Sequence, residues 1–206
     1  MKRACALVLF AAAVAAGTLA STARADGDPA SDYLLTQKVF FPFDTKFPAT
    51  QQAEFAGLVE GVNRAGFKLR VALIASTYDM GSVTSLYRRP RTYAHFLGAE
   101  ISFVYTQRLL VVMPNGFGFN WPKHPTTPAY AVLAKIPIRP GPTGLLAAAR
   151  TAVQRLTAAA GIKVAAPTNV TTPAQRNSHD RLIIIVAVLA ALLLAAATRL
   201  ALRRRG

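Results

Sequence analysis

The chain has 206 residues, a formal net charge of +15 and a single cysteine, Cys5. Because Cys5 lies in a segment that we expect to be removed, the mature chain would hold no disulfide, no thiolate metal site and no cysteine nucleophile. More than half of the charge lies at the two ends: residues 26–180 hold 16 Lys and Arg and all nine acidic residues, an excess of +7. For a domain predicted to lie outside the cell, this excess does not indicate nucleic acid binding.

Residues 1–25 have the pattern of a secretory signal peptide. Basic Lys2 and Arg3 precede the apolar stretch, and Ala23-Arg24-Ala25 forms an A-x-A cleavage pattern. The alternative is an uncleaved first membrane helix, for which the apolar stretch is short. We expect cleavage after Ala25.

The C-terminal end predicts a membrane anchor. Residues 182–202 form one long apolar run, interrupted only by Arg199, whose side chain could reach the interface. A buried core helix is the alternative, but it would need apolar partners on all sides. The basic tail, residues 203–206, favours the cytoplasmic side, so we expect a single-pass cell-membrane protein with its N-terminal domain outside and its C-terminus cytoplasmic. The Pro- and Thr-rich residues 164–181 are predicted to be a stalk.

Residues 26–163 are long enough for one domain with a sizeable core. Thr50–Ala65 places apolar residues at helical spacing, and Lys68–Ser76 becomes wholly apolar, as in a central strand. Thr92–Ile101 is predicted to be a second helix after a break at Pro90, and Gln107–Met113 a second buried strand.

A proline-rich passage follows, with a predicted strand over Tyr130–Ile136, and Gly144–Ala160 is predicted to be the last helix. The alternation of strands and helices favours an α/β fold: a single three-layer sandwich with a mostly parallel sheet, followed by one C-terminal transmembrane helix.

The stretch from Pro114 to Trp121 is predicted to be a turn. Pro114 cannot donate to a sheet ladder, and Asn115-Gly116 is a strong turn pair. The aromatic residues Phe117, Phe119 and Trp121 follow within five positions. We expect a mainly structural corner whose aromatic rings could also form a recognition surface at the carboxyl ends of the strands.

Four phrases in the middle of the chain resemble the TPM domain family. They are QQAEFAGLVEGVNRAGFKLRVALIAS, RTYAHFLGAEI, RLLVVMPNGFGF and GPTGLLAAARTAVQRLTAAAG, within Val39–Gly161. The matching details are the Tyr93-Ala94 pair on a helix and a Gly-aromatic-Gly turn at residues 116–118. The resemblance implies an extracytoplasmic α/β module between a signal peptide and a membrane helix.

In that family, bacterial members are mostly uncharacterised, whereas plant relatives are linked to photosystem repair and phosphatase activity. Some members bind divalent cations through acidic residues, but this chain is poor in acids. Asp44 and Asp79 are the two acids near element ends, and they are the candidate ligands for calcium or magnesium. The alternative is that Asp44 is an ordinary turn or capping residue and that Asp79 begins the next loop with Met80-Gly81.

Two hypotheses follow for function. The first is a membrane-anchored binding or accessory module, without catalytic activity, that engages an envelope protein or an anionic polymer. Its candidate contacts are the three aromatics above and the basic residues Arg88, Arg89 and Arg91, for which a plain solvated surface is the alternative. The second is a metal-assisted phosphatase-like hydrolase that uses Asp44 and Asp79. A domain that only scaffolds stays open as a third possibility.

Overall fold

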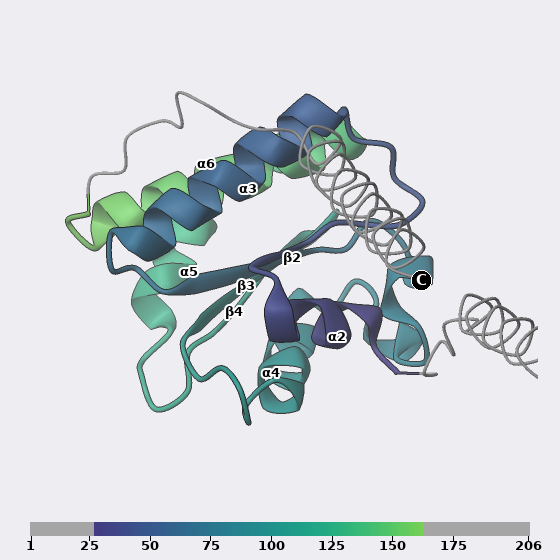
Figure 1. Ribbon diagram of the computed structural model, residues 1–206, viewed down its shortest axis with the longest axis horizontal. Helices are drawn as coiled ribbons and strands as arrows, with labels where there is room; N and C mark the ends of the chain where they lie inside the picture. The colour runs from purple at the N-terminus through teal and green to yellow at the C-terminus, as the bar shows by residue number, and fades with distance from the viewer. Residues whose placement is uncertain (1–26, 163–206) are drawn as a thin grey trace, which may run out of the picture.

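The computed structural model describes residues 27–162, in which a four-stranded sheet lies between helices (Figure 1). The strands stand in the order β1-β2-β3-β4; the first three are parallel and β4 is antiparallel to β3. They are β1 (Val39–Phe40), β2 (Leu69–Leu73), β3 (Arg108–Met113) and β4 (Gly116–Asn120). The predicted α/β class with a mostly parallel sheet is confirmed. The predicted signal peptide, stalk, span and tail lie outside the described residues.

Helices cover both faces of the sheet. One face carries α3 (Ala49–Arg64), α5 (Thr127–Leu133) and α6 (Pro142–Ala159). The other carries α2 (Pro29–Thr36), α4 (Pro90–Glu100) and the short 3-10 helices η2 (Thr77–Met80) and η3 (Thr84–Leu86). Among these described residues, no helix is both long enough and apolar enough to cross a bilayer.

The central strands are apolar on both sides because each side meets a helix layer. In β3, Leu110 and Val112 belong to the core beneath α3 and α6, whereas Leu109 and Val111 belong to the core beneath α4. Successive side chains of a strand point to opposite faces, so a strand covered twice must be hydrophobic throughout. Coverage on both sides explains why residues 109–113 of β3, LLVVM, are all apolar. The strand predictions for Lys68–Ser76 and Gln107–Met113 are confirmed, with small changes at the ends.

The two parallel crossovers have opposite hands. The sheet advances in one direction from β1 through β2 to β3, yet the intervening helices α3 and α4 lie on opposite faces. Right-handed crossovers in one direction would put both helices on the same face, so one of the two connections is left-handed, against a strong general preference.

Two predicted elements were wrong in type. Residues 130–136 are not a strand, because α5 occupies Thr127–Leu133. Conversely, the stretch after Asn115 is not an irregular corner but the strand β4. The predicted turn itself is confirmed at Pro114 and Asn115, which join β3 to β4.

The glycines of β4 have a packing role. Phe117 and Phe119 point into the core beneath α5 and α6, so Gly118 faces α4 on the other side. A β-carbon at Gly118 would collide with the carbonyl of Pro90 and crowd Ala94. The pattern Gly-Phe-Gly-Phe therefore gives β4 one bulky face and one bare face, which lets α4 lie directly on the strand.

The other helices were predicted within a few residues, except at the N-terminus. We observe α3, α4 and α6 close to the predicted ranges, although α4 begins at Pro90, which the prediction treated as a break. The helix α2 was not predicted, and its start carries a recognisable signal: Asp28 is the N-cap and Pro29 occupies the first turn.

The two ends of the sheet are distinguished by the direction of the strands. The carboxyl edge is the end where β2 and β3 finish and β4 begins; the amino edge is the end where β2 and β3 begin and β4 finishes. The helices α3 and α4 run from the carboxyl edge to the amino edge, because each leads into the first residue of the next parallel strand.

Candidate functional site

A cleft of about 690 Å³ opens beside β4 at the carboxyl edge. It lies between the start of α4, the β3–β4 turn, α5 and the segment after α5. Its lining residues are Arg89, Pro90, Arg91, Thr92, Pro114, Asn115, Gly116, Phe117, Tyr130, Leu133, Ala134, Ile136 and Ile138. The carboxyl edge of an α/β sheet is where such proteins most often bind ligands.

One wall of the cleft is cationic and the opposite wall is apolar. Arg89 and Arg91 line it from α4, and both side chains are exposed. The guanidinium of Arg91 lies 4.3 Å from the centre of the Tyr130 ring, so it reaches across from α4 to α5. Stacking on a ring orients a guanidinium without neutralising it, and its N–H groups stay available for an anion.

The hydroxyl of Tyr130 holds α5 against the free side of β4. The hydroxyl donates to the carbonyl of Phe119 at 3.1 Å and accepts the backbone N–H of the same residue at 2.9 Å. One side chain thereby satisfies two backbone groups that an edge strand would otherwise leave open. This contact fixes the helix that forms the apolar wall.

The β3–β4 turn is tied to the segment before α4. The Asn115 Nδ2 donates to the carbonyl of Arg88 at 2.6 Å, and Arg88 has a left-handed backbone with φ of 61°. The structure thus brings the predicted Arg88, Arg89 and Arg91 beside the predicted turn. Only Arg89 and Arg91 line the cleft; Arg88 lies next to it and is exposed.

The predicted aromatic surface needs correction. Phe117 and Phe119 keep only 8% and 6% of their surface exposed and belong to the core, so they are not free recognition groups. Phe117 still contributes to the lining of the cleft. Trp121 lies at the other end of β4, at the amino edge, and stacks on His124 with ring centres 3.7 Å apart. The three aromatics do not form one surface, because β4 is extended.

The two predicted metal ligands, Asp44 and Asp79, both lie near the loop that follows β1, but one is exposed and the other is buried. Asp79 is fully buried, and its carboxylate accepts the backbone N–H groups of Phe43, Ala75 and Ser76 at 2.8–3.0 Å. It therefore ties the segment that follows β1 to the end of β2. Asp44, next to Phe43, is exposed. Asp79 closes a capping box with Ser76 at the start of η2, a role that the sequence did not predict for it, and these bonds account for its burial. The pair as a metal site stays a prediction.

A buried aspartate–tyrosine pair was missed by the sequence reasoning. The Tyr93 hydroxyl donates to the Asp28 carboxylate, at 2.8 Å from both oxygens, and Asp28 also accepts the N–H of Ala30. Burial raises the pKa of Asp28 to about 6, and Glu100 and Asp32 add to the rise. Burial and the neighbouring Asp28 raise the pKa of the Tyr93 hydroxyl. This pair fastens α2 to α4.

Within residues 27–162, no group of three or more His, Cys, Asp and Glu side chains is placed to hold a metal ion. Comparisons with protein-family models, with curated proteins and with solved structures found no match. The chemistry of the candidate site therefore has to be inferred from the cleft itself.

Proposed function

We propose that this protein is a single-pass, membrane-anchored extracytoplasmic binding module that holds an anionic partner in the cleft between α4 and α5. The observation that carries the proposal is the pairing of Arg89 and Arg91 with an apolar wall in one cavity at the carboxyl edge. Such a cavity suits an acidic group attached to an apolar body. An envelope protein with an acidic, apolar segment and an anionic envelope polymer both have this chemistry.

The anchoring and the location outside the cell belong to the same proposal. They rest on the signal peptide pattern of residues 1–25, the apolar run of residues 182–202 and the basic tail. The TPM family is proposed as the nearest type of domain, since those domains are α/β modules with this arrangement of ends. The observed mostly parallel sheet flanked by helices is consistent with that resemblance.

The hydrolase alternative receives less support. Both carboxylate oxygens of Asp79 are already engaged by backbone N–H groups inside the core. A hard cation requires several accessible oxygen ligands. Of the two predicted ligands, only Asp44 is exposed. The cleft, in contrast, is lined by cations, which favours binding of an anion over binding of a metal ion.

The proposal can be tested with the full chain purified in detergent and two probes. One probe is a glycerol-phosphate oligomer, and the other is a short peptide with acidic and aromatic residues. We expect one probe to bind at low salt, and the double variant Arg89→Gln with Arg91→Gln to weaken binding about tenfold or more, as expected for the loss of two charge-assisted contacts.

The matched control is Arg64→Gln, which removes an exposed arginine at the other end of the domain. It should leave the affinity within about twofold, because screening weakens distant charges. If Arg64→Gln weakens binding as much as the double variant does, the probe senses net charge and the cleft is not the site. If neither probe binds at low salt, the proposed chemistry of the cleft is wrong.

A further inference from the structure

The amino edge carries a second surface, in which cations alternate with aromatic rings. The guanidinium of Arg108 lies 4.3 Å from the ring centre of Phe67 on one side and 3.7 Å from that of Trp121 on the other. Trp121 in turn stacks on the exposed His124. Arg70 stacks on Tyr105 in the same way, at 4.1 Å.

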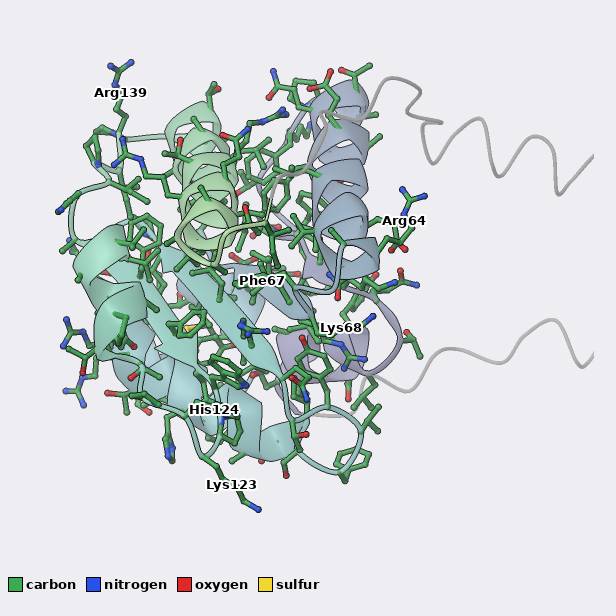
Figure 2. All side chains as sticks on the ribbon, turned by 90° about the vertical axis from the view of Figure 1, so that its left-hand side faces the viewer. Arg64, Phe67, Lys68, Lys123, His124 and Arg139 are labelled. Atoms are coloured by element: carbon green, nitrogen blue, oxygen red, sulfur yellow. The ribbon has the colours of Figure 1, made fainter. Side chains whose placement is uncertain are left out.

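Exposed lysines and apolar side chains surround this stack. Lys68 and Lys123 are exposed beside it, and Figure 2 shows both, with His124, on the side turned toward the viewer. The loop between α4 and β3 reaches the same edge, because β3 begins there. That loop leaves 75% of Phe103 and 53% of Val104 exposed, which is unusual for large apolar residues.

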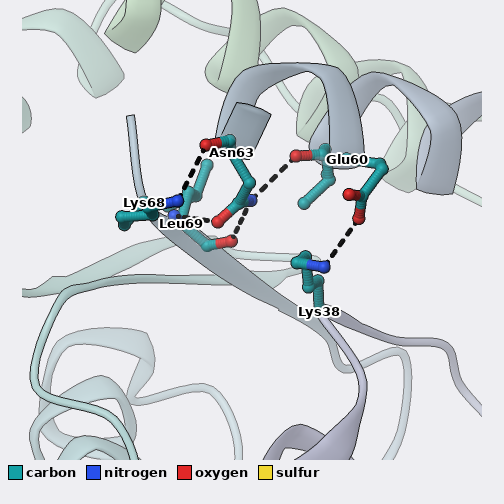
Figure 3. Close-up of polar contacts among 6 residues, drawn as sticks. Lys38, Glu60, Asn63, Lys68 and Leu69 are labelled. Atoms are coloured by element: carbon teal, nitrogen blue, oxygen red, sulfur yellow. Dashed lines mark hydrogen bonds and ion pairs between the residues drawn. The ribbon is translucent and has the colours of Figure 1, made fainter. Parts of the chain in front are cut away.

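The frame beneath this surface is fixed by polar contacts (Figure 3). The side chain of Asn63 donates to the carbonyls of Val59 and Leu69 and accepts the N–H of Leu69, so the end of α3 is bound to the start of β2. Lys68 donates to the carbonyl of Asn63 at 3.2 Å. Nearby, Glu60 is paired with Lys38 at 2.7 Å, so these two charges offset each other.

The described domain also ends on this side. Gly141 and Pro142, at the start of α6, line a small cavity with Ala75 and Pro114 at the carboxyl edge. The helix finishes at the left of Figure 1, the side that Figure 2 turns toward the viewer. The described residues therefore end at the amino edge.

We propose that the amino-edge face, defined as Lys68, Phe103, Val104, Arg108, Trp121 and Lys123, docks on the anionic phospholipid headgroups of the membrane that holds the anchor. This inference rests on the proposed membrane anchor. The lysines suit anionic headgroups, and the exposed Phe103 and Val104 suit the interface, where apolar side chains are favoured. Trp121 is stacked between Arg108 and His124 and lies within this face as its reporter. The cleft at the carboxyl edge then stays open to its partner.

The predicted stalk has a suitable length for this contact. A chain of 18 residues has an end-to-end distance of about 20–25 Å as a flexible coil and of at most about 56 Å as an extended Pro-rich segment, and a domain of this size has a radius of gyration of about 14 Å. The bilayer therefore lies within reach of the amino edge. Tethering raises the local concentration of the lipid surface, so weak contacts suffice.

The test uses the only tryptophan of the chain, Trp121, as a reporter on this face. The full chain is reconstituted in vesicles of phosphatidylcholine, with or without phosphatidylglycerol, that contain a lipid with a quencher on its headgroup. We expect Trp121 emission to fall about twofold further in the anionic vesicles, and about 0.5 M salt to reverse that difference, as for contacts between solvent-exposed charges.

Charge variants locate the contact. Lys68→Gln combined with Lys123→Gln should abolish the additional quenching, whereas Arg89→Gln at the other edge should leave it unchanged. Both lysines are exposed. Lys68→Gln removes the bond to the carbonyl of Asn63, but the three bonds of the Asn63 side chain that join α3 to β2 do not involve Lys68 and remain.

Three outcomes would overturn the inference. If the chain floats with the vesicles but quenching is equal in both lipids, docking is wrong while the anchor stands. If the chain does not float with vesicles at all, the anchor and the docking fail together. If Trp121 emission depends on protein concentration and not on lipid, the face joins copies of the chain.

Discussion

The two edges of the sheet hold their cations in different ways. At the carboxyl edge, Arg89 and Arg91 line an open cavity, and only Arg91 touches a ring, that of Tyr130. At the amino edge, the guanidinium of Arg108 is enclosed between Phe67 and Trp121, and burial lowers its pKa. Arginine side chains are therefore available to bind an anion at the carboxyl edge, whereas at the amino edge Arg108 packs between aromatic rings.

This difference shows that the charge excess of the domain is not one surface. The helix α4 connects the two edges, since it begins at the cleft and ends before the loop with the exposed Phe103. A change that displaces α4 should affect both edges, whereas a change within one edge should leave the other intact.

The largest effect is expected from Gly118→Ala, which should separate α4 from β4. The new methyl group would meet the carbonyl of Pro90, a backbone atom that cannot move without its helix. We expect the free energy of unfolding to fall by about 3 kcal/mol, as in overpacked cores, and binding in the cleft to be lost with it. Chemical denaturation of the domain measures the loss.

The matched control is Gly27→Ala, because a β-carbon there has no atom within 4 Å. Its effect should stay within about 0.5 kcal/mol. Equal stabilities of the Gly118 and Gly27 variants would show that α4 does not lie on the bare face of β4 as described.

The second effect concerns the fastening of α2 to α4 by Asp28. The pKa of Asp28 is raised from 3.8 to about 6 in the folded protein, so the folded state binds this proton more tightly than the unfolded chain does. The contribution of Asp28 to stability therefore falls as the pH rises from about 4 to 6, by on the order of 2 kcal/mol.

Asp28→Asn removes this titration and keeps an oxygen for the N–H of Ala30. Relative to the variant, the wild type should lose stability between pH 4 and pH 7, as measured by denaturation at each pH. A constant difference across this range would contradict the raised pKa. The binding of probes by the cleft should change little, because Asp28 does not line it.

The smallest effect is expected from Arg108→Lys at the amino edge. A lysine keeps the charge but not the planar group that fits between Phe67 and Trp121. We expect a loss of about 1 kcal/mol and a shift in Trp121 emission, with the cleft unaffected. Arg64→Lys, an exposed arginine at the same edge, is the control and should change neither stability nor emission.

Several elements could be predicted because their signals are local. The helical spacing of α3 and the uninterrupted apolar run of β3 indicate their own structure, since burial on one side or on two sides dictates the pattern. The turn at Pro114 and Asn115 was equally legible. The strand β4 was not, because its glycines resemble loop residues until α4 is seen to lie on them.

Only part of the candidate site could be predicted from the sequence. The basic residues near Arg89 were singled out from their sequence, but nothing there distinguishes a solvated arginine from one that lines a cavity. Asp28 and Tyr93 lie 65 positions apart, and only the fold shows that they form a buried pair. A pairing at that distance leaves no periodic trace in a single sequence.

The sequence by itself determined the α/β class and the alternation of most elements, because periodicity and composition are properties of short segments. The arrangement of the ends stays a prediction from the same kind of pattern. The tertiary structure decided which residues meet: the cleft beside α5, the burial of Phe117 and Phe119, and the stack around Arg108. Those features depend on which face of each strand a distant helix covers. That choice is made by packing across the whole domain.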